Sequence, residues 1–300
     1  MALPDYKSLG FKEIKAYLDE GVLVIIFDRA KQRNTFVDPV VNELTRVFEL
    51  GDKDPRVRVI IFTAEHTAPA YCSGADISGG WSGLWKEEET REGPLAHRDG
   101  GGKVTLAIYN CRKITIAAVN GHAAGVGMTA LQLPFDLRFV WGGAKLSFPF
   151  IRRGIVPEAA STYLLPRLIG HSRANSLFLT GGTFSPNSPQ IQSLYHEILP
   201  TREEVFPKAL ALAKELAVNA APRSVTYTKG LVQHPGDSLE ENHLLDSKAL
   251  KIVAASKDAA EGAKSFFERR PPRWEDPSSS VETHHPWWKT LDVKHRPSKL

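Results

Sequence analysis

Two glycine-containing turns each follow a run of apolar residues that is typical of a buried strand. Residues 72–77 read Cys-Ser-Gly-Ala-Asp-Ile and follow a strand predicted at 59–63, and residues 120–127 read Asn-Gly-His-Ala-Ala-Gly-Val-Gly and follow a strand predicted at 114–119. Glycine lets backbone approach a ligand closely, and a helix beginning at the second turn would point unpaired N–H groups at that ligand. If the turns face each other, two backbone amides could be directed at one oxygen atom, as in an oxyanion hole.

The second turn also has an alternative interpretation as a dinucleotide site. Residues 125–130 read Gly-Val-Gly-Met-Thr-Ala and formally match the G-x-G-x-x-A pattern. That pattern expects an acidic residue about 20 positions later, whereas residues 143–147 read Gly-Ala-Lys-Leu-Ser. Glycines used only for packing are a third alternative. The sequence favours the oxyanion interpretation over both.

Alternating strands and helices are predicted to position these turns. Residues 11–29 predict a hairpin, and Asp38-Pro39 predicts a helix start with Asp38 as the N-cap. That helix and the strand at 57–63 imply a parallel strand pair with a right-handed crossover. Further strands are predicted at 114–119 and 136–141, and further helices at 104–112, 125–133, 158–181, 201–220 and 238–269. The chain is therefore expected to be an α/β protein whose last third is helical.

Three regions follow from this pattern, with boundaries at 200 and 269. Residues 1–200 form the predicted α/β core, residues 201–269 the helical region and residues 270–300 an extended arm. Within the core, residues 79–103 are rich in glycine and charge and predict a mobile, partly helical loop.

The helical region has an apolar face for which the sequence suggests no covering sheet. We therefore predict that it is a subunit interface of a closed assembly. The residues that supply this face are Val205, Leu210, Leu212, Leu216 and Val218.

Composition excludes several classes of protein. Of 300 residues, 42% are apolar and 24% are charged, which is ordinary for a soluble globular protein, and the net charge of +4 does not indicate a nucleic-acid partner. The two cysteines, Cys72 and Cys111, predict buried reduced thiols rather than a disulfide scaffold. No signal-peptide pattern opens the chain, and no apolar run approaches the ~20 residues that a membrane span needs.

The last three residues are Ser298, Lys299 and Leu300, and this tripeptide is a peroxisomal address when it stands at a free C-terminus. It predicts a peroxisomal location and a peroxisomal import receptor as a partner. The signal is read by a receptor and carries no information about the fold.

Several segments, taken in order, resemble the crotonase, or enoyl-CoA hydratase/isomerase, superfamily. The resemblance covers roughly residues 12–268 and is carried by residues 70–77, 117–127, 136–138, 148–150 and 154–170. It implies a crotonase-type spiral of ββα units with a helical C-terminal trimerisation region, assembled as a trimer or hexamer. It also implies an acyl-CoA substrate, with no separate cofactor because coenzyme A is part of the substrate, and no metal.

The resemblance assigns roles to both glycine turns. The thioester oxygen would lie between the backbone amides of Ala75 and Val126. The segment expected to line coenzyme A comprises Gly74, Asp76, Ile77, Ser78 and Gly79. Asp76 is expected to fix this loop as a hydrogen-bond acceptor rather than to act as an acid.

Hydratases of this family use two glutamates, and the matching positions here are Thr129 and Phe150. Neither side chain can carry a proton, which argues against two-glutamate hydration. Glu158 follows Pro157 at a predicted helix start and resembles the single glutamate of peroxisomal 3,2-trans-enoyl-CoA isomerases. The residues alone would favour a carboxylate that complements a helix dipole, but the resemblance implies a base that removes a proton from C2 and returns it at C4.

Three functions remain compatible with the sequence. The leading one is isomerisation of 3-enoyl-CoA to trans-2-enoyl-CoA by Glu158. The second is hydration of an unusual branched or polyunsaturated acyl-CoA. The third is non-catalytic binding of acyl-CoA, against which Glu158 argues because a binding protein does not need it.

Overall fold

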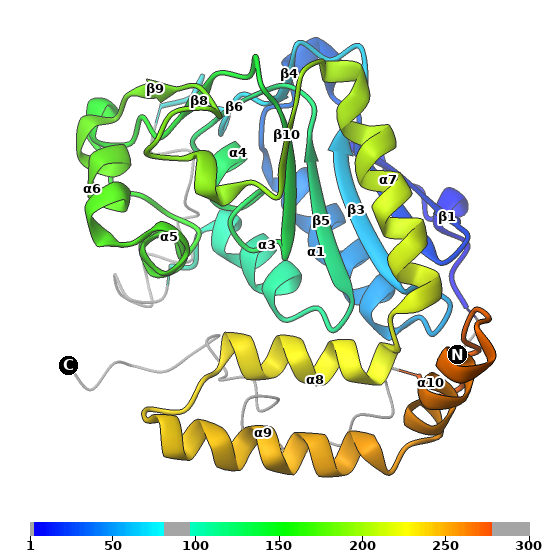
Figure 1. Cartoon of the computed structure of the whole chain (residues 1–300). Helices are drawn as coiled ribbons and strands as arrows, with labels where there is room; N and C mark the ends of the chain where they lie inside the picture. The colour runs from blue at the N-terminus through cyan, green and yellow to red at the C-terminus, as the bar shows by residue number, and fades with distance from the viewer. Residues whose placement is uncertain (1–2, 81–96, 278–300) are drawn as a thin grey trace.

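A computed structural model describes residues 3–80 and 97–277. In this part of the chain, a six-stranded sheet has the order β1-β2-β3-β5-β7-β10 (Figure 1). β1 and β2 form the predicted antiparallel hairpin, and the other neighbouring strands are parallel. The strands span Ile14–Asp19 (β1), Val22–Phe27 (β2), Val59–Ala64 (β3), Ile114–Val119 (β5), Leu137–Trp141 (β7) and Glu197–Leu199 (β10). The predicted α/β class is confirmed.

A second, smaller sheet continues the first along the chain. β4, β6 and β8 directly follow β3, β5 and β7, and they pair in parallel in the order β4-β6-β8, with β9 antiparallel at the edge. These strands span Ala70–Cys72 (β4), His122–Ala124 (β6), Leu146–Ser147 (β8) and Thr183–Phe184 (β9). Because β4 and β6 are neighbours, the two glycine turns that follow them lie side by side.

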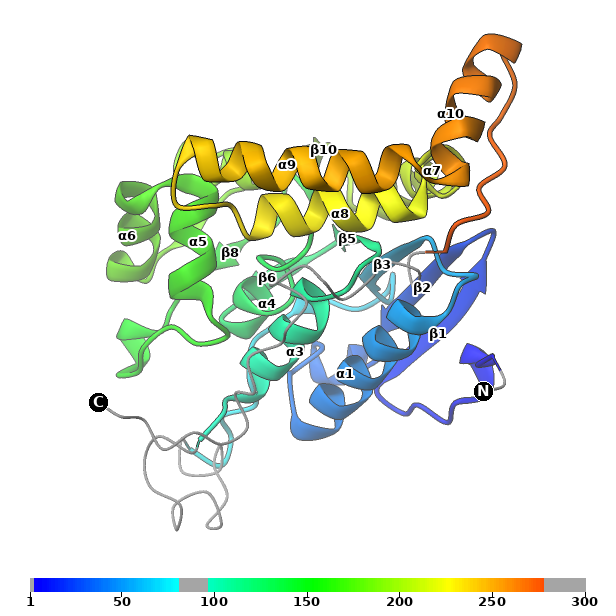
Figure 2. The same cartoon turned by 90° about the horizontal axis from the view of Figure 1, so that it is seen from below.

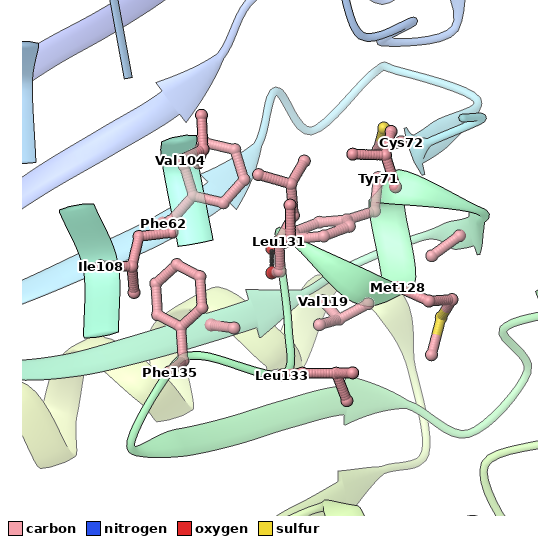
Figure 3. Close-up of a cluster of buried hydrophobic side chains, with 14 of the residues drawn as sticks. Phe62, Tyr71, Cys72, Val104, Ile108, Val119, Met128, Leu131, Leu133 and Phe135 are labelled. Carbon is pink, nitrogen blue, oxygen red and sulfur yellow. Dashed lines mark hydrogen bonds between the residues drawn. The ribbon is translucent and has the colours of Figure 1, made fainter. Parts of the chain in front are cut away.

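Helices cover both faces of the large sheet (Figure 1). On one face lie α1 (Asp38–Lys53) and α3 (Gly100–Tyr109), which pack on each other. The apolar side chains beneath them form the main core, and Figure 3 shows the part of it where Phe62 and Phe135 stack and Tyr71 meets Phe62 edge-on. Fully buried strands such as β3 have continuous apolar runs because both of their faces are covered.

The opposite face of the sheet is covered by α7 (Arg202–Asn219), which corrects the expectation that this region lacks a partner sheet. Ala209, Ala213 and Ala217 repeat at every fourth position and are buried against the strands. Small side chains at this spacing let the helix lie close to the sheet. Of the five apolar residues predicted to be uncovered, Val205 is buried, three are partly buried against this second core, and Val218 is 49% exposed.

The remaining C-terminal helices extend below the sheet. α8 (Pro222–Gln233) and α9 (Leu239–Ala254) lie side by side, and α10 (Lys257–Glu268) projects beyond them (Figure 2). Large apolar side chains on this extension are exposed, namely Val232, Leu239, Leu244, Leu250, Phe266 and Phe267. No helix within residues 3–80 and 97–277 is both long and apolar enough to cross a membrane.

Several predicted helix ends were wrong. The N-cap of α1 is Val37, so Asp38 is its first residue. α3 begins at Gly100, four residues before the predicted start, because Asp99 caps it by accepting a hydrogen bond from the Gly102 amide. The helix predicted at 125–133 is only α4 (Val126–Thr129).

The helical pattern predicted at 158–181 corresponds to two helices, α5 (Ser161–Ile169) and α6 (His171–Thr180). They are separated by Gly170, whose φ of +82° suits glycine. Glu158 therefore lies in the loop before α5 and not at a helix start.

Candidate active site

The two glycine turns touch through their backbones. A Cβ placed on Gly125 would lie 4.0 Å from Cα of Gly74, and one placed on Gly74 would lie 3.3 Å from the carbonyl oxygen of Ala124. Both glycines have positive φ, +107° at Gly74 and +53° at Gly125. The close approach and the left-handed backbone together explain why glycine stands at both positions.

A bridge to a neighbouring segment orients the amide of Ala75. The Phe36 amide donates a hydrogen bond to the Gly74 carbonyl (2.9 Å), and the Phe36 carbonyl accepts one from the Asp76 amide (3.1 Å). Ala75 therefore lies between two residues that are hydrogen bonded to Phe36. The Ala75 N–H shares a trans peptide unit with the Gly74 carbonyl and therefore points the opposite way, away from Phe36. It donates no backbone hydrogen bond within the described part of the chain.

The amide of Val126 is oriented by the short helix α4. The Gly125 carbonyl accepts hydrogen bonds from the amides of Met128 (2.8 Å) and Thr129 (3.0 Å), so this carbonyl points into the helix. The Val126 N–H belongs to the same peptide unit and points outward from the helix start. Since β6 and β4 are paired, the Ala75 and Val126 amides lie on adjacent turns.

Glu158 lies against the same helix. The Thr129 hydroxyl donates a hydrogen bond to its Oε1. The pKa of Glu158 is raised to about 8, chiefly by burial and also by the neighbouring Asp99, while the hydrogen bond from Thr129 acts in the opposite direction. The carboxyl group is therefore held in a site where its proton-bound form is favoured at neutral pH.

The backbone after Glu158 is held in a costly conformation. Ala159 and Ala160 have φ of +59° and +52°, a region that residues with a Cβ adopt at a cost of about 1 kcal/mol or more each. The loop is tied by the Glu158 carbonyl, which accepts from the amide (3.0 Å) and hydroxyl (2.6 Å) of Ser161. Such strain persists where the surrounding structure fixes a side chain in place.

Sequence reasoning missed a second carboxyl group at this position. Asp99 lies next to Glu158, accepts a hydrogen bond from the Ala159 amide (3.2 Å), and also caps α3. The signal that could have found it is an aspartate directly before a helix, but the helix was obscured because it opens with Gly100, Gly101 and Gly102. Its segment was instead assigned to the loop predicted at 79–103.

The structure brings together some of the predicted positions and not others. Thr129 binds Glu158, whereas Phe150 is buried in the main core and neither Phe150 nor Thr129 offers a carboxyl group. Nδ1 of His122 accepts a hydrogen bond from the Lys145 amide (2.9 Å), and its ring contacts the Trp141 ring. Cys72 and Cys111 are free and buried.

The segment expected to line coenzyme A follows the first turn and is exposed. Asp76 Oδ1 accepts a hydrogen bond from the Ser78 amide (3.0 Å), which lowers the pKa of Asp76, and Ile77 is 43% exposed. Gly74 lies at the turn itself and Gly79 is exposed. Ser298, Lys299 and Leu300, most of the arm at 270–300 and most of the loop at 79–103 lie outside the described residues.

Comparisons with known proteins agree with this arrangement. A family model described as enoyl-CoA hydratase/isomerase matches residues 18–277. A protein named enoyl-CoA hydratase AFT3-1, from Alternaria alternata, is 42% identical over 257 residues, which cover 86% of this chain and 84% of that protein. A protein named mevalonyl-coenzyme A hydratase SIDH, from Beauveria bassiana, is 29% identical over 265 residues, which cover 85% and 91%.

A solved structure of enoyl-CoA hydratase from Bacillus anthracis has a TM-score of 0.76 and 28% sequence identity, and the match covers 88% of this chain and 99% of that chain. The chain therefore belongs to the enoyl-CoA hydratase/isomerase family of the crotonase superfamily.

Proposed function

We propose that this acyl-CoA enzyme shifts the double bond of a 3-enoyl-CoA to give a trans-2-enoyl-CoA. The observation that carries the proposal is the position of Glu158, a half-buried carboxyl group beside the paired glycine turns, while Thr129 and Phe150 occupy the places where a carboxyl pair would be needed for hydration. Glu158 removes a proton from C2, the C2–C3 bond becomes double as the C3–C4 double bond is lost, and the same group returns the proton to C4.

The two amides supply the other half of this chemistry. When C2 loses its proton, negative charge collects on the thioester oxygen, and the N–H groups of Ala75 and Val126 stabilise it there. A base with a pKa of about 8 can both take up and release a proton near neutral pH. Because the reaction begins with ionised Glu158, its rate should rise as the pH approaches and passes 8.

Hydration of a 2-enoyl-CoA is the second candidate. Two observations favour it: Asp99 supplies a second carboxyl group beside Glu158, and relatives at 42% and 29% identity are named hydratases. In this reaction one carboxyl group would activate water and the other would protonate C2.

Absorbance of the conjugated thioester separates the candidates. The isomerase raises this absorbance when it is given a 3-enoyl-CoA, and a hydratase lowers it when it is given a trans-2-enoyl-CoA. A protein that changes neither signal but binds both thioesters would contradict both activities.

For the location we propose import into peroxisomes by a receptor that reads Ser298, Lys299 and Leu300. Deletion of these three residues should leave the activity of the purified protein unchanged and leave a fluorescent fusion in the cytosol. The fusion must be expressed in cells that lack the full-length chain, because a truncated subunit could enter attached to intact ones. A truncated fusion that still enters peroxisomes would contradict this assignment.

For the assembly we propose a trimer, or a hexamer of two trimers, formed through the C-terminal helices. The support is the exposed apolar surface on α9 and α10, where Leu244, Leu250, Phe266 and Phe267 are each at least 70% exposed. Light scattering at micromolar concentration should give three or six times the chain mass of 33.1 kDa. A stable, active species of one chain mass would contradict the assembly and leave the chemistry untouched.

A further inference from the structure

The carboxyl groups of Asp99 and Glu158 are neighbours, since Oε2 of Glu158 and Oδ1 of Asp99 both face Gly101, and Asp99 contributes to the raised pKa of Glu158. Asp99 is fixed from two sides, because its Oδ1 accepts hydrogen bonds from the Gly102 amide (2.5 Å) in α3 and from the Ala159 amide (3.2 Å) next to Glu158. The first turn of α3 and the loop before α5, which are about 60 residues apart in the chain, are thus joined at one side chain.

Gly101 shows how closely α3 approaches the pair. A Cβ built on Gly101 would collide with Oε2 of Glu158 and would lie 3.2 Å from Oδ1 of Asp99. Gly101 itself is buried. A glycine at this position in a helix lowers its stability by about 1 kcal/mol relative to alanine, and here it leaves the room that the Glu158 carboxyl group occupies.

Two carboxyl groups side by side repel each other when both are ionised, so one of them tends to keep a proton. Oδ1 of Asp99 already accepts two amide hydrogen bonds, whereas Glu158 accepts one from the hydroxyl of Thr129. Burial, with a smaller contribution from Asp99, raises the pKa of Glu158 to about 8, so the proton resides on Glu158.

The other groups that face Glu158 do not account for the proton that Glu158 keeps. The Thr129 hydroxyl of α4 donates to Oε1 and by itself would favour the ionised form. The Cys72 thiol of β4 lies within electrostatic reach of Glu158, and burial raises its pKa to about 12, so it stays neutral. Among the described residues, the groups that influence the ionisation of Glu158 include no cation.

From this geometry we propose that Asp99 is a positioning residue that keeps the exchangeable proton on Glu158 in the resting enzyme. The consequence for catalysis rests on the proposed function: Glu158 must lose this proton before it can act as the base. Asp99 thereby adds to the effect of burial and raises the pH above which proton abstraction from C2 begins. No other described carboxyl group contacts Glu158 in this way.

The test compares Asp99→Asn with wild type by infrared titration, in which the carbonyl band of a protonated carboxyl group is followed against pH. Subtracting the spectrum of the matching Glu158→Gln protein isolates Glu158. Replacing the Asp99 carboxyl group should move the titration midpoint of Glu158 down by at least about one pH unit. At a pH below both midpoints, the ionised fraction of Glu158 would then be about tenfold larger in the variant than in wild type. An unchanged midpoint would overturn the proposal.

A second variant separates the charge of Asp99 from its capping of α3. Asp99→Ser keeps a good N-cap but removes the carboxyl group, so its midpoint should match that of Asp99→Asn. Asp5→Asn serves as the matched control, since Asp5 caps the short helix Tyr6–Ser8 far from the site, and it should leave the midpoint unchanged. If Asp99 only stabilised the fold by capping α3, Glu158 would have the same midpoint in Asp99→Ser as in wild type.

The titration is independent of turnover, so it distinguishes this proposal from the proposed function. If the wild type isomerises 3-enoyl-CoA, the activity of Asp99→Asn relative to wild type should be greater at pH 6 than at pH 9. A shifted midpoint in a protein without isomerase activity would support the carboxyl pair and refute only the isomerase. Isomerase activity with equal pH profiles in both proteins would refute the role of Asp99.

Discussion

Glu158→Gln should lower isomerase turnover by about a thousandfold or more while acyl-CoA affinity stays within a few fold. General acid–base catalysis by one group contributes about 10²–10⁴, and this group acts in both proton transfers. Glutamine can still accept the hydrogen bond from the Thr129 hydroxyl, so the shape of the site is retained. The measurement is kcat with a 3-enoyl-CoA together with the Kd for a saturated acyl-CoA.

The same variant should not be less stable than wild type. The pKa of Glu158 is about 8 in the folded chain, against 4.5 for an unperturbed glutamate. Stability contributed by its protonated form is present below about pH 4.5 and is lost as the pH rises through about 8. Glutamine does not ionise, so the stability of Glu158→Gln relative to wild type should increase across this range.

The control for this variant is Glu240→Gln, since Glu240 is an exposed residue in the first turn of α9. It should retain wild-type kcat. If Glu158→Gln keeps a tenth or more of the wild-type activity, Glu158 is not the base.

Val126→Pro should lower kcat/KM by about 10²–10³, the usual effect of removing one donor from an oxyanion hole. Proline lacks the N–H that we assign to the thioester oxygen. It is nevertheless suited to the first position of a helix, where the N–H makes no intrahelical bond, and Val126 is the first residue of α4. The measurement is steady-state kinetics beside a melting curve.

Val126→Ala is the matched control because it retains the N–H and shortens the same buried side chain. It should lose some stability and keep activity within a few fold. Equal losses in the two variants would show that packing at Val126, and not its amide, is what catalysis requires.

Much of the fold could be predicted because local patterns decide it. A continuous apolar run of this length, such as 59–64, is typical of a strand covered on both faces, and the structure has β3 there. The glycine turns after β4 and β6 were also recognisable, since a positive φ or a close backbone contact demands glycine. These features need no information about the partners that lie elsewhere in the chain.

The missed features depend on such partners. The apolar face of α7 was visible in the sequence, but nothing local indicates that the large sheet covers it. Asp99 precedes three glycines, which have low helix propensity and therefore predicted a loop. The helix forms because Asp99 caps it and because Gly101 makes room for Glu158, a residue 57 positions later.

The central claim is that Glu158 carries one proton from C2 to C4, and isotope transfer tests it most directly. The substrate is a 3-enoyl-CoA that bears two deuterium atoms at C2, incubated with the enzyme in ordinary water. We predict a trans-2-enoyl-CoA with one deuterium remaining at C2 and with deuterium transferred to C4, because the same carboxyl group takes up and returns the deuteron within one turnover. A product that carries only solvent hydrogen at C4, or a hydroxyl group at C3, would contradict the single-glutamate shuttle.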